Sequence, residues 1–178
     1  KTKLAIEIAK HFDTEIISCD SRQFFKEMKI GTATPSKEEL AQVKHHFVGN
    51  LSVTDYYSIG QYETDALQKL EEIFQEKDIA VLVGGSMMYE KAVAEGLNDL
   101  PEANAENQEK LQKIWDEEGL EKLQQILENL DEEYYNVVHK ENPRRLLRAI
   151  DVIWQTGRKY SEIIAEPKHK RNFRMVRI

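Results

Sequence analysis

Apolar positions in the first hundred residues follow two patterns, helical spacing and short unbroken apolar runs. Residues 4–12 and 59–77 place apolar side chains three or four residues apart, which predicts two helices. Residues 15–19 and 79–83 are short runs rich in β-branched side chains, which predicts two strands. The run at 79–83 lacks polar alternation, as in a strand buried on both faces of a parallel sheet. The alternation of helices and strands therefore predicts an α/β fold with a parallel sheet flanked by helices.

The pattern changes at Gly96, after which only helical spacing is visible up to about residue 139. This stretch is acidic and predicts an all-helical subdomain inserted into the α/β core. A further helix is expected to start at Asn142-Pro143 and to end at Gly157, followed by a last strand at 173–178. We therefore predict a discontinuous core of residues 1–96 and 140–178, with a helical insertion at 97–139.

Composition restricts the class of protein. The 178 residues contain one cysteine, which excludes an internal disulfide and a cysteine-rich zinc site within this sequence. No apolar run approaches the ~20 residues of a membrane span, and no secretory signal pattern is present, so we expect a cytoplasmic protein. Residues 140–178 carry 11 Lys and Arg against 4 Asp and Glu, whereas residues 1–139 carry 14 against 28. This asymmetry predicts either a basic face for an anionic partner or a solvated basic tail.

Candidate chemistry lies where the predicted strands end. Asp20 follows the first strand, at the sheet edge where open α/β folds bind ligands, although an Asp in this place is also a common turn former. The second strand ends at Gly84-Gly85-Ser86, where two glycines let the backbone approach a ligand. We expect Ser86 to be a helix N-cap that points into the same crevice as Asp20, or a plain cap.

Two groups of residues could bind phosphate. Lys1-Thr2 opens a helix and matches the end of the phosphate loop G-x-x-x-x-G-K-[ST], although the glycines do not precede it here and a frayed terminus is the alternative. Arg144, Arg145 and Arg148 lie within two turns of one helix, so two or three guanidinium groups could converge on phosphate, or pair with the acidic insertion. His45-His46 would point to opposite faces of a strand, which is poor geometry for one metal ion.

Several segments occur together in a characteristic order, and they resemble the bacterial tRNA dimethylallyltransferases, the IPP transferase family. The matching residues are Glu15-Ile16-Ile17-Ser18-Cys19-Asp20-Ser21-Arg22-Gln23, Ile30-Gly31-Thr32-Ala33-Thr34-Pro35, His45-His46, Tyr57-Ser58, Leu82-Val83-Gly84-Gly85-Ser86 and Pro143-Arg144-Arg145-Leu146-Leu147-Arg148-Ala149. The resemblance implies a P-loop NTPase-like core whose helical insertion contacts the anticodon stem-loop of tRNA. It also implies a fragment, because the family's glycine loop and C-terminal region are absent from this sequence.

The resemblance implies an activity. The family transfers a dimethylallyl group from dimethylallyl diphosphate to N6 of the adenosine 3′ to the anticodon, in tRNAs that read codons starting with U, and releases diphosphate. Asp20 then looks like the catalytic base, Lys1 and Thr2 like the diphosphate contacts, and Thr2 like a ligand of Mg²⁺ held through the diphosphate. The residues that look like tRNA contacts are Asp20, Ser21, Arg22, Gln23, Ser86, Gln108, Arg144, Arg145, Leu146, Leu147 and Arg148.

The sequence departs from the family pattern in four places. Ser86 replaces a usual Thr, Thr34 a usual Lys, Arg22 a usual apolar residue, and Gln108 a usual tRNA-contacting Arg, which puts the contact of Gln108 in doubt. Three other functions stay open from the sequence. They are prenylation of free adenine nucleotides, a P-loop small-molecule kinase, and a non-catalytic RNA-binding module. We expect a monomer without a membrane partner.

Overall fold

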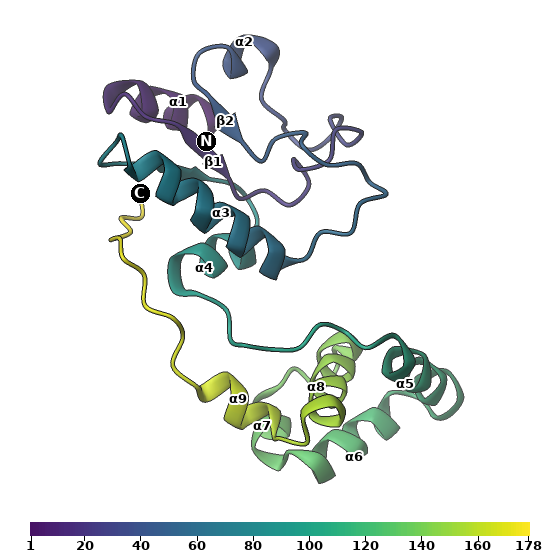
Figure 1. The fold of residues 1–178 in the computed structure, drawn as a ribbon. Coiled ribbons are helices and arrows are strands. Elements are labelled where there is room, and N and C mark those ends of the chain that lie inside the picture. The colour runs from purple at the N-terminus through teal and green to yellow at the C-terminus, as the bar shows by residue number, and fades with distance from the viewer. The chain divides into compact units, whose positions relative to one another are not determined.

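The computed structural model describes all 178 residues and divides them into two compact units (Figure 1). The first unit comprises Lys1–Leu97 and His169–Ile178, and the second comprises Asn98–Lys168. No helix in either unit combines the length and the apolar composition that spanning a membrane requires.

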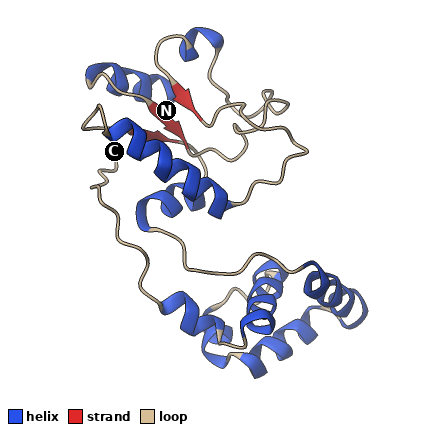
Figure 2. Cartoon of the chain, viewed as in Figure 1, coloured by secondary structure: helices blue, strands red, loops and turns tan.

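The first unit is an α/β unit with a parallel three-stranded sheet in the order β2-β1-β3 (Figure 2). Ile16 and Ile17 of the central strand pair with His45 and His46 on one side and with Val81 and Leu82 on the other. The elements in chain order are α1 (Thr2–His11), β1 (Ile16–Ser18), α2 (Lys37–Leu40), β2 (His45–His46), α3 (Ile59–Phe74), β3 (Val81–Val83) and α4 (Met87–Glu95). The predicted α/β class and the parallel sheet are therefore confirmed.

The core of this unit has two clusters, one between α1 and β1 and a larger one where β1 meets α3. β1 is buried along its whole length, and the Tyr62 hydroxyl of α3 donates to the carbonyl of Ser18 at 3.0 Å. Phe24 stacks on the Tyr62 ring with a centroid separation of 5.1 Å. Cys19 is buried beside this cluster, and its N–H donates to the Val83 carbonyl at 2.8 Å. The turn after β1 is therefore held on a rigid base.

Two expectations for the first unit are wrong. Val81–Val83 was predicted to be buried on both faces, but all three residues are only half-buried, because β3 is an edge strand and β1 alone has neighbours on both sides. No strand forms at 173–178. Those residues are irregular, and Phe173 packs against Phe74 of α3 instead of pairing with the sheet.

The second unit is all-helical. Its elements are α5 (Ala105–Glu118), α6 (Leu120–Leu130), α7 (Glu132–Val137), α8 (Pro143–Thr156) and α9 (Tyr160–Ala165). The buried side chains of its core are Leu111, Leu123, Leu127, Val138, Leu146, Leu147, Ala149, Ile150 and Ile153. The predicted return of the α/β pattern at Asn142 is thus wrong, and the boundary predicted near 140 lies at 168. The broad apolar side of α8 is buried against α5 and α6, because those helices present matching leucine stripes.

A buried carboxylate ties two helices of the second unit together. Asp131 is fully buried, caps α7 by accepting from the Tyr134 N–H at 3.0 Å, and accepts from both the N–H (2.7 Å) and the hydroxyl (2.8 Å) of Ser161 in α9. Burial alone would raise the pKa of Asp131, but the hydrogen bonds from Ser161 and Tyr134 hold this pKa below its ordinary value.

We expect Asp131→Asn to destabilise the second unit by about 2 kcal/mol at pH 7, because hydrogen bonds to a buried charged acceptor are lost. A carboxylate with a lowered pKa stabilises the fold above the ordinary pKa of about 3.9, and this contribution is lost as the pH falls through the folded-state pKa. The difference between the two proteins should therefore shrink below about pH 4. Both tryptophans, Trp115 and Trp154, lie in this unit, so their fluorescence during denaturation follows its unfolding. A difference that is constant with pH would contradict this role.

Candidate functional site

A cavity of about 220 Å³ lies at the carboxyl ends of the strands of the first unit. It is bounded by the start of α1, by the residues that follow β1 and β3, and by part of the loop before α2. Its lining residues are Lys1, Thr2, Ser18, Asp20, Gln23, Ala33, Pro35, His45, Val48, Val83, Gly84 and Gly85. The structure therefore brings together Lys1, Thr2, Asp20 and the glycines that the sequence indicated.

The backbone around Asp20 orients its carboxylate. Asp20 Oδ1 accepts from the Arg22 N–H at 3.1 Å, and the Asp20 N–H donates to the Ser18 hydroxyl at 3.3 Å. A Cβ atom added to Gly85 would lie 3.1 Å from Asp20 Oδ2. Glycine at 85 thus leaves the second carboxylate oxygen unobstructed. A half-buried carboxylate fixed by one oxygen is well placed to accept a proton with the other.

Ser86 connects α4 to the turn that carries Asp20. It occupies the N-cap position of α4 as predicted, but its hydroxyl makes no cap hydrogen bond. Instead, Ser86 Oγ accepts from the Ser21 N–H at 3.0 Å and lies 3.0 Å from the Ser21 hydroxyl. The two serines therefore hold the loops after β1 and β3 together at one side of the site.

Gln23 positions a wall of the cavity. Its side-chain amide donates to the carbonyls of Thr32 and Ala33, both at 3.1 Å, and its carbonyl accepts from the Ser18 hydroxyl at 3.3 Å. Because these groups are already paired, Gln23 shapes the loop of Ala33 and Pro35. Arg22, by contrast, is exposed.

Lys1 and Thr2 stand at the N-terminal end of α1, where backbone N–H groups lack helical partners and attract anions. Lys1 is exposed and makes no side-chain cap hydrogen bond, and the half-buried Thr2 offers a hydroxyl oxygen. No group of three or more His, Cys, Asp or Glu side chains could hold a metal ion. The residues present fit Mg²⁺ only as a partly protein-bound ion that takes further oxygen ligands from a phosphate group.

The predicted tRNA contacts of the second unit fall into two groups. Arg144 and Arg145 are exposed in the first turn of α8, and Gln108 is half-buried on α5. Leu146 and Leu147 are 0% and 9% exposed, so their side chains belong to the core, and a contact with RNA at these positions could come only from the backbone.

Arg148 has partners within its own unit. Its guanidinium lies 3.2 Å from the carboxylate of the fully buried Asp151 and also donates to the Pro101 carbonyl. Asp151 further accepts from the side-chain amides of Asn107 and Gln155, each at 3.0 Å. Arg148 is therefore ion-paired, which is one of the two alternatives left open by the sequence. Its partner Asp151 lies on α8 itself and not in the acidic stretch before it. Arg144 and Arg145 are the arginines left accessible in that turn.

His45 lines the cavity, although the sequence assigns it no role beyond the family resemblance and a geometry poor for metal binding. Its Nδ1 lies 2.8 Å from the Val43 carbonyl, so Nδ1 carries the proton and Nε2 is left as an acceptor. Nε2 is buried and has no partner. His46 differs, since its Nε2 lies 2.5 Å from Glu15. The alternation of side chains along a strand could have indicated this difference, because it places His45 and His46 on opposite faces of the sheet.

We expect His45→Phe to change the stability of the first unit by less than about 1 kcal/mol, because losing the bond to Val43 is offset by removing an unpaired buried acceptor. Phe has no acceptor in place of Nε2, so a hydrogen bond from a ligand donor to this atom would be lost. Activity should then fall about 10-fold, which corresponds to one hydrogen bond of about 1.4 kcal/mol. Thermal unfolding and turnover of the same preparation measure both quantities. Unchanged turnover would restrict His45 to packing.

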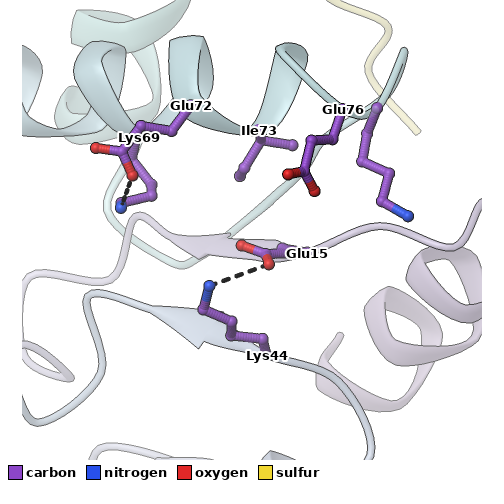
Figure 3. A pocket seen from close by; sticks show the side chains of 7 residues that line it. Glu15, Lys44, Lys69, Glu72, Ile73 and Glu76 are labelled. Carbon is purple, nitrogen blue, oxygen red and sulfur yellow. Dashed lines mark hydrogen bonds and ion pairs between the residues drawn. The ribbon is translucent and has the colours of Figure 1, made fainter.

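A second pocket, of about 170 Å³, lies between α3 and the residues that precede β1 and β2 (Figure 3). Its charges are largely paired. Glu15 accepts from Lys44 at 3.1 Å, and Lys69 pairs with Glu72. Burial would raise the pKa of Glu15, but hydrogen bonds from His46 and Lys44 keep this pKa lowered. A charged ligand would have to displace these partners, so the first cavity is the better candidate.

A parallel sheet with a cavity at the carboxyl ends of its strands, next to a helix N-terminus, defines a P-loop-like α/β protein. The family model described as IPP transferase matches residues 23–178. The chain belongs to the IPP transferase family.

Individual relatives agree with this assignment. The chain is 48% identical to a tRNA dimethylallyltransferase of Christiangramia forsetii and 45% identical to tRNA dimethylallyltransferase 1 of Bacteroides fragilis, in each case over 100% of this chain and 59% of the relative. It thus spans about three fifths of the length of these curated relatives.

Two solved structures are similar. The full-length tRNA isopentenylpyrophosphate transferase of Bacillus halodurans is 31% identical, with a TM-score of 0.53 over 88% of this chain and 52% of that chain. A eukaryotic dimethylallyltransferase, solved in snapshots of its action on tRNA, is 23% identical, with a TM-score of 0.75 over 94% of this chain and 42% of that chain, and supports the fold.

Proposed function

We propose that the protein containing this chain transfers a dimethylallyl group from dimethylallyl diphosphate to N6 of the adenosine 3′ to the anticodon of tRNA, releasing diphosphate. The observation that carries the proposal is the convergence of Asp20, Lys1 and Thr2 on one cavity. Family membership and the names of the relatives support the choice of reaction. We further propose that the enzyme is cytoplasmic and monomeric.

The proposed chemistry assigns one task to each group. The N6 amine attacks the allylic carbon, the bond from that carbon to the diphosphate oxygen breaks, and Asp20 accepts the proton that the amine loses. Lys1 and the N-terminal N–H groups of α1 stabilise the negative charge on the leaving diphosphate. Mg²⁺, when bound with the diphosphate, neutralises charge, and Thr2 is the residue proposed to hold it.

The second unit is proposed to contact the anticodon stem-loop. Arg144 and Arg145 are exposed and positively charged, so they can neutralise backbone phosphates of an RNA. The remaining proposed contacts are Ser21, Arg22, Gln23, Ser86, Gln108 and Arg148. Of these, Arg22 is the one most open to RNA, because Ser21, Gln23, Ser86 and Arg148 already have partners.

The decisive experiment incubates the full-length enzyme with dimethylallyl diphosphate, Mg²⁺ and an anticodon stem-loop that contains the target adenosine. Mass spectrometry of the RNA should show one added isopentenyl unit on that adenosine. Addition to AMP or ATP but not to RNA would replace the proposal with prenylation of free nucleotides. ATP turnover without RNA would favour a small-molecule kinase.

A further inference from the structure

The C-terminal segment of the first unit, His169–Ile178, contacts helices α3 and α4, and its most deeply buried contact is made by Arg171. The Arg171 guanidinium donates to the Val93 carbonyl from Nε at 2.9 Å and to the Ala92 carbonyl from Nη2 at 2.7 Å, and it pairs with Glu63 of α3. Only 11% of the Arg171 side chain and 17% of the Glu63 side chain are exposed. Both carbonyls belong to the last turn of α4, where positive charge is favourable. The Ala92 carbonyl also accepts from the Gly96 N–H at 3.0 Å.

The same carboxylate oxygen of Glu63 holds a second segment. Glu63 Oε1 also accepts from the Leu97 N–H, at 3.3 Å. Leu97 is the last residue of the first unit before the chain enters the second, and the C-terminal segment begins at His169, where the chain returns. One carboxylate therefore fixes the outgoing segment directly and the returning segment through Arg171.

The contact between Glu63 and Arg171 differs from an ordinary surface ion pair in its burial and in the number of its partners. Arg177, in the same segment, pairs with Glu90 (2.9 Å) and Glu95 (3.3 Å) of α4, but 62% of its side chain is exposed. It makes no hydrogen bond to Leu97 or Glu63. Exposed pairs of this kind contribute little to stability, because water screens the two charges. Arg171, by contrast, uses the planar fork of its guanidinium for three acceptors, which Lys could not satisfy in the same geometry.

We propose that Glu63 and Arg171 form a latch that pins both connections between the two units to the end of α4. α4 begins directly after Gly84-Gly85-Ser86, so the latch also fixes the helix that follows the cavity-lining glycines Gly84 and Gly85. This role rests on the proposed function: Glu63 and Arg171 are positioning residues that couple the RNA-contacting unit to the reaction without touching a substrate.

The first test does not depend on catalysis. Hydrogen exchange is measured on the full-length enzyme and on Glu63→Gln, Arg171→Lys and the matched control Arg177→Lys. We expect Glu63→Gln and Arg171→Lys to accelerate exchange at Leu97 at least 10-fold and to expose the returning segment, with β1 and α8 unchanged. Arg177→Lys should resemble the parent enzyme. Unchanged exchange at Leu97, or accelerated exchange throughout the first unit, would overturn the latch.

The second test measures steady-state kinetics of the same proteins with an anticodon stem-loop. We expect the KM for RNA to rise about 5- to 10-fold in Glu63→Gln and Arg171→Lys, while the KM for dimethylallyl diphosphate stays constant. An equal loss with both substrates would mean a merely stabilising contact and would overturn the coupling. If the parent enzyme transfers no prenyl group, the proposed function is refuted. Hydrogen exchange at Leu97 does not need activity and still shows whether the latch exists, so the two failures are distinguishable.

Discussion

Asp20→Asn is expected to lower the rate of prenyl transfer at least ~100-fold while leaving RNA affinity within a factor of about two. Loss of a general base costs 10²–10⁴-fold, roughly, because the amine proton has no acceptor in the transition state. The amide oxygen of Asn can still accept from the Arg22 N–H, so the turn after β1 should keep its structure. Single-turnover rates at saturating dimethylallyl diphosphate, with binding of the stem-loop measured separately, check both parts.

Asp55→Asn is the matched control for this experiment. Asp55 Oδ2 accepts from the Ser52 N–H at 2.7 Å in a similar local turn, but Asp55 is exposed and does not line the cavity. The control should therefore transfer the prenyl group at the parent rate. Parent-like turnover by Asp20→Asn would remove Asp20 from the chemistry, whereas parallel losses in both variants would indicate a general effect of removing a turn carboxylate.

Gly84→Ala is expected to destabilise the first unit by about 3 kcal/mol or more and to abolish activity. A Cβ at position 84 would lie 2.4 Å from the Cys19 carbonyl carbon and 2.7 Å from the Asp20 nitrogen. Both atoms are backbone, so no side chain can move aside. The ends of β1 and β3 would have to separate, at the upper range of the cost of overpacking. Hydrogen exchange in β1 and denaturation by urea measure the loss.

The control for this substitution is Gly60→Ala in α3. The nearest atom to a Cβ at position 60 is the Ser58 hydroxyl oxygen, at 3.8 Å, and alanine is favoured over glycine in a helix by up to ~1 kcal/mol. Gly60→Ala should therefore leave stability unchanged or raise it. In Gly84→Ala, the fluorescence transition of the two tryptophans in the second unit should stay in place. Parent-like stability of Gly84→Ala would show that the strand ends adjust freely.

The sequence predicts two adjacent strands of the sheet and the cavity at their carboxyl ends, because both depend on local patterns. The apolar run before Asp20 gives a buried strand, and the run before Gly84 gives its parallel neighbour. Strands that are parallel end at the same edge, so Asp20 and Gly84-Gly85 were expected to meet, and they line one cavity.

Features that depend on long-range packing could not be predicted in the same way. Periodicity shows that α8 has an apolar side, but it does not tell which helices cover that side, so α8 was placed with the sheet instead of with α5 and α6. For the same reason, Leu146 and Leu147 were grouped with the neighbouring arginines although they point into the core. The bond between Glu63 and Arg171 joins residues 108 positions apart, and no spacing rule indicates it.

The single thiol of this chain offers a chemical probe of how often the site opens. Burial, together with the negative charges of Glu90 and Asp20, raises the pKa of Cys19 to about 12, and the side chain is 2% exposed. Thiols react with alkylating reagents as thiolates, so Cys19 should be inert in the closed structure. It is also the residue before Asp20 and bonds to the strand that leads into Gly84. The rate at which Cys19 is alkylated would therefore report how often the ends of β1 and β3 separate. A ligand that binds in the cavity and holds these ends together would lower this rate.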